Sequence, residues 1–169
     1  MRGQIHKTRI HTEFDAPIGK LLLIAGDRTL LRVLLPGESR DRSLVGNRCN
    51  NTSEEPPLKE AVEFLTRYFK SEPVSWKGKP IPGGTEFLQR LWQATAAIPF
   101  GKTVSYGDLA ARVGIPLAAR AVGQGMARNP LPILVPCHRV IAADGSLGGY
   151  GGGLEMKRWL LRHEGIVPK

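Results

Sequence analysis

Cysteine is scarce in this sequence. Only Cys49 and Cys137 occur among the 169 residues, and neither belongs to a Cys-x-x-Cys pair. Zinc fingers and thioredoxin-like redox proteins need such pairs, so both classes are unsupported and no metal site is predicted. Thiols of intracellular proteins are usually reduced, and we therefore predict no disulfide between the two cysteines. The role of each one has to be inferred from its surroundings.

Long apolar runs are also missing. No stretch approaches the roughly 20 consecutive apolar residues that span a bilayer. The start of the chain, MRGQIHKTRIHTEFD, contains no apolar segment typical of a secretory signal. We therefore expect an intracellular, cytoplasmic protein with no membrane partner. The hydrophobic content of 41% suffices for one sizeable core or two small ones.

Acidic residues are few. Asp and Glu number 15 against 24 Lys and Arg, which gives a formal net charge of +9. Between Gly101 and Arg139 the only acid is Asp108, and the basic residues are Lys102, Arg112, Arg120, Arg128 and Arg139. Such a distribution favours a polyanionic partner, nucleic acid first. Charge alone leaves open a basic protein without such a partner.

Two regions with different periodicity predict an α/β (α+β) fold. The runs GKLLLIAG and TLLRVLLP are typical of strands joined by a hairpin, so residues 1–35 are predicted as strands. Residues 36–57 are predicted to form a loop, which would leave Cys49 exposed and incidental. From Pro57 to Lys70 apolar residues recur with helical spacing. The Pro- and Gly-rich segment 71–85 then marks the boundary between a small strand-rich domain and a helical one.

The second half is predicted to contain a helix-turn-helix. Ser105 and Asp108 form a capping box for a short helix from Tyr106 to Arg112. A second helix is predicted from Pro116 to about Ala127, where it stops before Asn-Pro. Two short helices joined by a Gly-containing turn are typical of this motif, and its second helix would carry Arg120. Many helix pairs bind no DNA, so the prediction of DNA binding depends on the local positive charge together with the motif.

Three further elements are predicted in the second half. They are a helix over residues 86–97, a short apolar strand over Leu131–Pro136 and a last helix over Leu154–His163. Before the last helix, the stretch GSLGGYGGG around Tyr150 does not match the pattern of a phosphate-binding loop. Its glycines can admit a flat ligand close to backbone N–H groups, or the stretch is a flexible surface loop.

Cys137 follows the apolar strand, in the sequence LVPCHRV. A nucleophilic cysteine has to reach the thiolate form, and with a pKa of about 8.5 only a few per cent is ionised at neutral pH. His138 is the adjacent base, and Glu164 is the best downstream carboxylate to orient it. A lone cysteine is most often a core residue and a lone histidine most often a satisfied polar one. These residue types alone therefore leave open whether Cys137 is a nucleophile or a packing residue.

Four motifs of the second half stand in a recognisable order: SYGDLA, ARAVGQGMAR, NPLPILVPCHRVI and GGYGGG…LLRHEG. In this order and spacing they closely resemble the O6-alkylguanine-DNA alkyltransferases. The match extends from about Gly84 to Gly165, and Pro-Cys-His-Arg-Val with the upstream Asn-Pro is highly specific to that family. The first half resembles the family only in layout. The resemblance implies a strand-rich, ribonuclease H-like domain over residues 1–76, a linker over 77–85 and a DNA-binding and active-site domain over 86–169.

This resemblance implies repair of alkylated DNA by direct reversal. The protein would bind double-stranded DNA containing alkylated guanine from the minor groove, as a monomer, and flip the damaged base into a pocket. The alkyl group of O6-alkylguanine, or of O4-alkylthymine, would pass irreversibly to Cys137 without a cofactor. The resemblance thus predicts a methylated-DNA–protein-cysteine S-methyltransferase that acts once per molecule.

Roles of individual residues are implied by the matching motifs. Cys137 is the acceptor, and His138 and Glu164 activate it through water. Asn129 braces the facing turn, and Tyr106 donates a proton toward the guanine ring. The remaining implied positions are Arg120, which fills the space left by the flipped base, with Tyr106, Gly107, Ala119 and Gly123 at the DNA, and Met126, Val140, Gly148, Gly149, Tyr150 and Gly151 around the substrate.

One position departs from the family pattern. Many members carry a serine after the loop aromatic, where this chain has Gly151. A hydroxyl contact to the substrate oxygen is then absent, so backbone N–H groups serve instead or larger alkyl groups are admitted. The cysteine cluster of a metal-binding sensor domain, present in some fused relatives, is absent as well. No zinc-dependent phosphotriester chemistry is therefore predicted.

Three other functions stay open at this point. A Cys-His hydrolase would need an oxyanion hole and would turn over repeatedly. A DNA-binding regulator would read sequence through the helix-turn-helix and use Cys137 only for packing. A damage-sensing, alkyltransferase-like binder would lack the acceptor cysteine, which this chain has.

Overall fold

The computed structural model describes residues 9–38, 45–78 and 81–169. Its first half contains a four-stranded sheet in the order β3-β2-β1-β4. The strands are β1 (Ile10–Ala16), β2 (Gly19–Gly26), β3 (Thr29–Leu34) and β4 (Asn47–Arg48). The predicted hairpin is confirmed, because Asp27 and Arg28 have positive φ values of 50° and 60°, as a tight turn between twisted strands requires. Of the strands expected over residues 1–35, the part before residue 9 lies outside the described residues.

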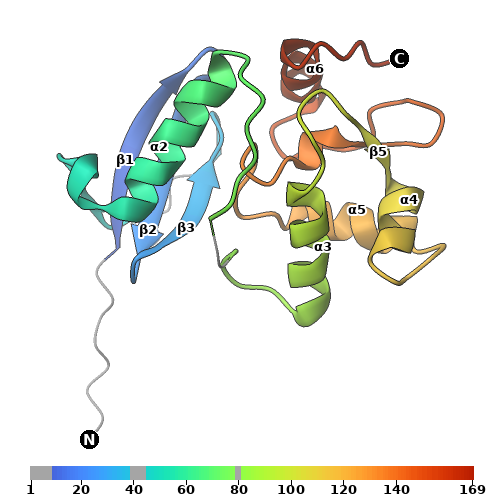
Figure 1. The fold of residues 1–169 in the computed structure, drawn as a ribbon, viewed down its shortest axis with the longest axis horizontal. Helices are drawn as coiled ribbons and strands as arrows, with labels where there is room; N and C mark the ends of the chain where they lie inside the picture. Colours follow the sequence, from blue (N-terminus) through green and yellow to red (C-terminus); the bar gives the residue numbers. More distant parts are fainter. Residues whose placement is uncertain (1–8, 39–44, 79–80) are drawn as a thin grey trace, which may run out of the picture.

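Helix α2 (Pro56–Phe69) packs on one face of this sheet (Figure 1). Proline suits the first turn of a helix, because its missing N–H needs no intrahelical partner there. The buried side chains of α2 recur with helical spacing, which confirms the helix predicted over residues 57–70. The residues of β2 divide alternately between two apolar clusters, so this strand is buried on both faces.

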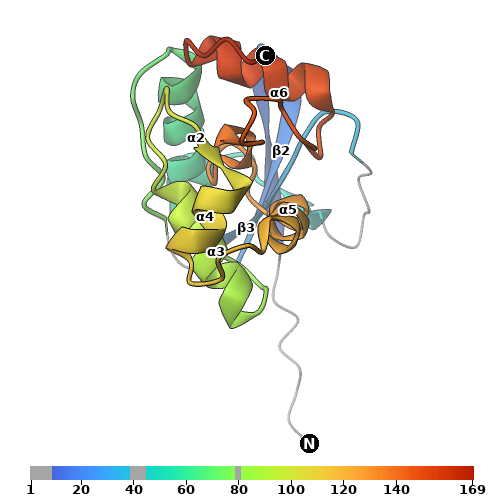
Figure 2. The same ribbon diagram turned by 90° about the vertical axis from the view of Figure 1, so that its right-hand side faces the viewer.

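The second half consists of short helices and a two-stranded parallel sheet. Figure 2 shows α3, α4 and α5 grouped below α6. Its elements are α3 (Glu86–Ala96), β5 (Val104–Ser105), α4 (Tyr106–Arg112), α5 (Ala119–Ala127), η2 (Cys137–Arg139), β6 (Val140–Ile141) and α6 (Leu154–His163). The N-cap at Ser105 is confirmed, since the backbone N–H of Asp108 donates to Ser105 Oγ at 3.0 Å and this hydroxyl donates to the Asp108 carboxylate at 2.7 Å. Helices α4 and α5 pack against each other as the predicted helix-turn-helix pair, and α3 contacts both.

The second helix of this pair starts three residues later than predicted. We expected a start at Pro116, but α5 begins at Ala119. Leu117 has a φ of 69°, in the left-handed region, so a right-handed helix cannot pass through it. Residues 116–118 therefore belong to the turn, and the side chain of Leu117 is fully exposed at its tip.

The prediction of a strand over Leu131–Pro136 is wrong. This segment is a turn, with Ile133 at a φ of 74° and a single isolated bridge between Pro132 and Val135. The turn is fastened by Asn129, whose Oδ1 accepts from the N–H of Leu131 (3.0 Å) and whose Nδ2 donates to the carbonyl of Val135 (2.8 Å). The apolar run can be buried as a turn because the Asn129 side chain and the backbone bond from the N–H of Val135 to the carbonyl of Leu131 (2.8 Å) satisfy backbone groups that a neighbouring strand would otherwise pair.

The prediction for residues 36–57 also needs correction. The described part of this segment contains β4 and a short 3₁₀ helix, η1 (Thr52–Glu54). Residues 39–44 lie outside the described part. Cys49 is half-buried against the main core, and its N–H donates to the carbonyl of His11 at 2.7 Å. It is a packing residue at the edge of the sheet, not an exposed loop residue.

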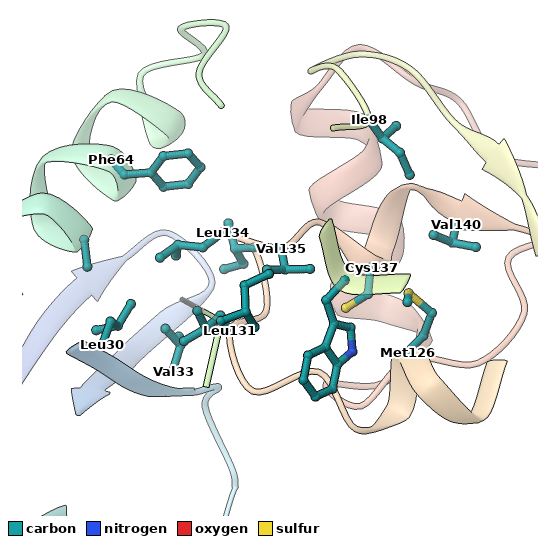
Figure 3. Close-up of a cluster of buried hydrophobic side chains, with 14 of the residues drawn as sticks. Leu30, Val33, Phe64, Ile98, Met126, Leu131, Leu134, Val135, Cys137 and Val140 are labelled. Atoms are coloured by element: carbon teal, nitrogen blue, oxygen red, sulfur yellow. The ribbon is translucent and has the colours of Figure 1, made fainter. Parts of the chain in front are cut away.

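One apolar core joins the two halves of the chain. Its buried side chains come from the sheet, from α2 and from the helices of the second half. Figure 3 shows Leu131, Leu134 and Val135 between Val33 of β3 and Cys137. The N–H of Val33 also donates to the carbonyl of Pro130 at 2.9 Å. The domain division at residues 77–85 stays a prediction, but the two halves pack as one body of apolar side chains. None of the described helices is long and apolar enough to span a membrane.

Candidate active site

The small parallel sheet places Tyr106 near Cys137. Strand β5 pairs with β6, with Val104 opposite Val140 and Ser105 opposite Ile141. Tyr106 follows β5 directly as the first residue of α4, and Cys137 opens the 3₁₀ turn that leads into β6. Tyr106 thus follows the C-terminal end of β5 and Cys137 precedes the N-terminal end of β6, and both side chains line one cavity.

Asn129 connects the buried turn to the cysteine. Besides its two bonds within the turn, Asn129 Nδ2 lies 3.2 Å from Cys137 Sγ and points an N–H at it. An amide N–H directed at sulfur stabilises the thiolate more than the thiol. The sequence predicted that Asn129 braces the facing turn, and the structure places it in that position.

Burial dominates the protonation of Cys137. It raises the pKa of the thiol above its ordinary value, while the hydrogen bond from Asn129 and the positive charge of Lys157 act in the opposite direction. The net shift is upward, so the resting cysteine is a protonated thiol at neutral pH. A reaction at this sulfur therefore requires a base that accepts its proton.

His138 and Glu164 form a buried pair beside the cysteine. His138 Nε2 lies 2.6 Å from Glu164 Oε1, and both side chains are fully shielded from solvent. Burial lowers the pKa of His138, against the opposing effect of Glu164, so the resting imidazole is neutral. Burial alone would raise the pKa of Glu164, but its bonds to His138 and Arg139 hold it at about 2.

The protonation states follow from these bonds. Glu164 is ionised and accepts only, so the proton of the neutral imidazole is on Nε2. The other ring nitrogen, Nδ1, is buried and has no hydrogen-bond partner among the described residues. His138 thus keeps an unprotonated nitrogen available as a base, with Glu164 ready to stabilise the imidazolium that forms.

Arg139 is part of the site, which the sequence did not predict. In the sequence, Arg139 is among the basic residues of segment 101–139 that favour a polyanionic partner, but the residue is only 2% exposed. Its Nε donates to Glu164 Oε2 at 2.9 Å, and its Nη1 donates to the carbonyl of Ile98 at 2.6 Å. Arg139 therefore neutralises Glu164 in the interior and adds nothing to the surface charge.

Lys157 of α6 is a second residue that the sequence did not predict. Its Nζ donates to the carbonyls of Val140 (2.7 Å), Leu147 and Gly149 (3.2 Å) and to Tyr106 Oη (3.4 Å). Burial lowers the pKa of Lys157 to about 8, and the neighbouring Cys137 opposes this effect. Burial also raises the pKa of Tyr106, so Lys157 places a cation beside a protonated phenol.

A cavity of about 540 Å³ opens onto this cluster. It is lined by Tyr106, Ala119, Arg120, Gly123, Met126, Ala127, Cys137, Gly149, Tyr150 and Gly151. All of these except Ala127 were predicted at the substrate or at the DNA. Arg120 is exposed at this cavity and makes no ion pair with a carboxylate of the described residues.

Three of the positions predicted at the substrate or at the DNA do not line the cavity. Gly107 is exposed on the first turn of α4. The side chain of Val140 lies in the core, and only its carbonyl takes part, as an acceptor for Lys157. Gly148 has a φ of 64° and lies so close to Tyr106 that an added Cβ would be 2.7 Å from its hydroxyl. Gly148 therefore packs against the side chain of Tyr106 and does not line the cavity itself.

No group of three or more His, Cys, Asp or Glu side chains within residues 9–38, 45–78 and 81–169 could hold a metal ion. The candidate site combines a shielded thiol (Cys137), a neutral base (His138), a phenol (Tyr106) and an apolar cavity. That set suits transfer of a small group to sulfur from a flat ligand inserted into the cavity.

Known proteins resemble the chain over most of its length. A family model described as the DNA-binding domain of 6-O-methylguanine DNA methyltransferase matches residues 86–166. The methylated-DNA–protein-cysteine methyltransferase of Mycobacterium leprae is 45% identical, with 89% of this chain and 88% of the relative covered. The protein of the same name from Methanosarcina acetivorans is 42% identical, with 90% and 96% covered. The crystal structure of Mycobacterium tuberculosis OGT in complex with DNA is similar at a TM-score of 0.80 and 38% identity, with 92% and 93% covered.

Proposed function

The chain belongs to the methylated-DNA–protein-cysteine methyltransferases, enzymes of DNA repair, and from this premise we propose that Cys137 takes the alkyl group from O6-alkylguanine in DNA. One observation carries this assignment. Cys137 is the only cysteine that lines the cavity, and Asn129 Nδ2 approaches its sulfur to 3.2 Å. The other cysteine, Cys49, lies at the edge of the sheet in the first half.

The transfer is a displacement at the alkyl carbon. The sulfur of Cys137 forms a bond to this carbon while the bond between the carbon and O6 of guanine breaks. The thiol proton passes through water to His138 Nδ1, and Glu164 stabilises the imidazolium. The N–H of Asn129 stabilises the negative charge that develops on sulfur.

Tyr106 acts on the leaving base. Its hydroxyl donates a proton to a ring nitrogen of guanine, so the base leaves as neutral guanine. Lys157 Nζ, 3.4 Å from this hydroxyl, stabilises the phenolate that remains. The raised pKa of Tyr106 keeps the phenol protonated until the base arrives.

DNA binding is assigned to the helix-turn-helix of α4 and α5. The face of α5 toward the cavity carries the small residues Ala119 and Gly123, which allow a close approach to the narrow minor groove. Extruding the alkylated base costs a few kcal/mol, least for a damaged and poorly paired base. Arg120 enters the duplex and occupies the space that the base leaves. No part of this scheme needs a second copy of the chain, and we propose that it acts as a monomer.

Substrate range follows from the open side of the cavity. A Cβ added at Gly149 or at Gly151 would have no atom within 4 Å. We therefore propose that alkyl groups larger than methyl are accepted. O4-alkylthymine presents the same kind of carbon–oxygen bond on a smaller base and is proposed as a second substrate. The product is a thioether without an easy hydrolytic exit, so each chain reacts once.

The intact mass of the protein separates this function from its rivals. The chain is incubated with a duplex that contains one O6-methylguanine, and it is weighed before and after. We expect the mass of one methyl group to be gained at Cys137, and no gain in a Cys137→Ser variant that still binds the duplex. Tight binding without a change of mass would favour a DNA-binding regulator, and repeated turnover on an acyl substrate would favour a Cys-His hydrolase.

A further inference from the structure

We propose that Tyr68, on α2 in the first half of the chain, is a positioning residue for the alkyl transfer, because it holds the His138–Glu164 pair and limits how strongly Glu164 binds His138. The inference rests on the proposed function of His138 as the base for Cys137. No motif in the sequence points to Tyr68, which lies 70 residues from His138 along the chain.

The hydroxyl of Tyr68 meets both members of the pair. Tyr68 Oη donates to Glu164 Oε1 at 2.9 Å and lies 3.4 Å from His138 Nε2. The same Oε1 atom lies 2.6 Å from His138 Nε2. Tyrosine and histidine therefore share one carboxylate oxygen, and their hydroxyl and imidazole compete for it.

Tyr68 has no freedom to move away from this contact. It is fully buried, and its ring packs against Phe69 (5.1 Å between centroids), His163 (5.2 Å) and Phe100 (5.9 Å). His163 Nε2 also lies 2.8 Å from the backbone carbonyl of Tyr68. A phenylalanine would make the same ring contacts. The hydroxyl is thus the one feature of Tyr68 that packing does not explain, and it points at the catalytic pair.

The other polar groups around the pair come from several elements. Arg139 of η2 donates to both oxygens of Glu164, and the N–H of Gly101, in the segment before β5, donates to Oε2 at 3.0 Å. Cys137 precedes His138 in η2, and the cation of Lys157 on α6 disfavours a charged His138. The hydroxyl of Tyr68 is the contribution of α2, and with the neutral imidazole of His138 it is one of two neutral side-chain donors to Glu164 among the described residues.

Removing the hydroxyl therefore has a directional effect. Without it Oε1 is shared with one donor fewer and binds His138 more strongly, which favours the imidazolium form. The pKa of His138 rises as a result. As the pH falls, His138 then becomes protonated, and can no longer act as a base, at a higher pH than in the wild type. The acid limb of the alkylation rate should move to higher pH.

The test compares rates of alkylation by free O6-benzylguanine, which needs no DNA, across pH for the wild type and Tyr68→Phe. We expect the acid limb of the variant to move upward by about half a pH unit or more, equivalent to about a threefold loss at a fixed pH on the limb. Phe69→Leu is the matched control, because it disturbs the same ring cluster without touching the hydroxyl. Its rates should scale by one factor at every pH.

Two results would overturn the inference. Normalised profiles of Tyr68→Phe and wild type that superimpose would mean that Tyr68 only packs, and a shift to lower pH would mean that the hydroxyl strengthens the base. Failure of the wild type to take up benzyl at Cys137 would instead contradict the proposed acceptance of alkyl groups larger than methyl, and the same pH profiles would then be measured with the O6-methylguanine duplex.

Discussion

At Cys137, burial and hydrogen bonding act in opposite directions. Burial raises the pKa of the thiol, whereas the N–H of Asn129 and the cation of Lys157 favour the thiolate. The protected resting form suits the single reaction proposed for Cys137, because a permanently ionised thiolate would be open to oxidation and to other electrophiles. In the proposed mechanism, His138 forms the thiolate only as the reaction proceeds.

Substitution of the single residue Arg120 tests the proposed base flipping. We expect Arg120→Ala to slow repair of a duplex with O6-methylguanine more than it slows reaction with free O6-benzylguanine, because its proposed role exists only where a base leaves a stack. Second-order rates on both substrates, measured for wild type and variant, check this prediction.

Arg128→Ala is the control for lost charge. Arg128 is exposed at the far end of α5, does not line the cavity and carries the same charge as Arg120. It should weaken binding to damaged and undamaged duplexes alike and lower the salt dependence by the amount of about one phosphate contact. An equal loss on both substrates for Arg120→Ala would instead assign Arg120 a structural role.

The sequence predicted some residues of this site and missed others for a physical reason. Cys137, His138 and Glu164 could be selected by chemistry and by motif, and Asn129 by its motif. Tyr68, Arg139 and Lys157 were missed because each acts through long-range contacts. Local sequence does not show whether an arginine or lysine lies on the surface or is buried against carbonyls and a carboxylate.

At the scale of elements, helix α5 is held against α3 at a glycine. The carbonyl of Gly125 accepts a hydrogen bond from Trp92 Nε1 at 3.0 Å. A Cβ added at Gly125 would overlap the side chain of Leu91, which is fully buried and cannot retreat. Gly123, half a turn earlier on the same helix, has only Tyr106 near an added Cβ, at 3.9 Å.

We therefore expect the two glycines to respond oppositely to alanine. Gly125→Ala should destabilise the protein by about 1–3 kcal/mol through overpacking. Gly123→Ala should be neutral, or stabilising by up to about 1 kcal/mol, because alanine favours a helix interior. Chemical denaturation of both variants measures the difference. Equal stability of the two would mean that the α3–α5 contact is loose.

Elements were predicted well where periodicity or capping decides them, and poorly where backbone conformation does. The positions of α2, α3, α4 and α6 followed from apolar spacing and from the Ser105 cap. The start of α5 and the Leu131–Pro136 turn depend on Leu117 and Ile133, two residues with positive φ that are not glycine. Such conformations are imposed by surrounding contacts, so the residue type gives no warning of them.

For the whole molecule, the shared core means that events at the active site affect the stability of both halves. The Asn129 side chain bonds Cys137 and fastens the turn that packs against β3. The sequence showed which faces are apolar, but it could not show that the faces of the two halves meet. The predicted domain boundary carries no information about this contact.

We expect alkylation of Cys137 to lower the melting temperature. The thioether sulfur is a weaker partner for Asn129 Nδ2, and a weakened buried hydrogen bond costs about 1–3 kcal/mol. That cost corresponds to a drop of several degrees for a chain of this size. Scanning calorimetry of free and fully benzylated protein, with DNA removed, measures it. An unchanged or higher melting temperature would show that the cavity holds the product without loss.

A titration shows whether Cys137 is a stoichiometric acceptor of the alkyl group, as we propose. A known amount of protein is mixed with excess duplex containing O6-methylguanine, and restored guanine is measured until it stops rising. We expect a plateau at one guanine per chain, one methyl group on the peptide that contains Cys137, and no restored guanine with Cys137→Ser. Continued release beyond one per chain, or full repair by Cys137→Ser, would contradict it.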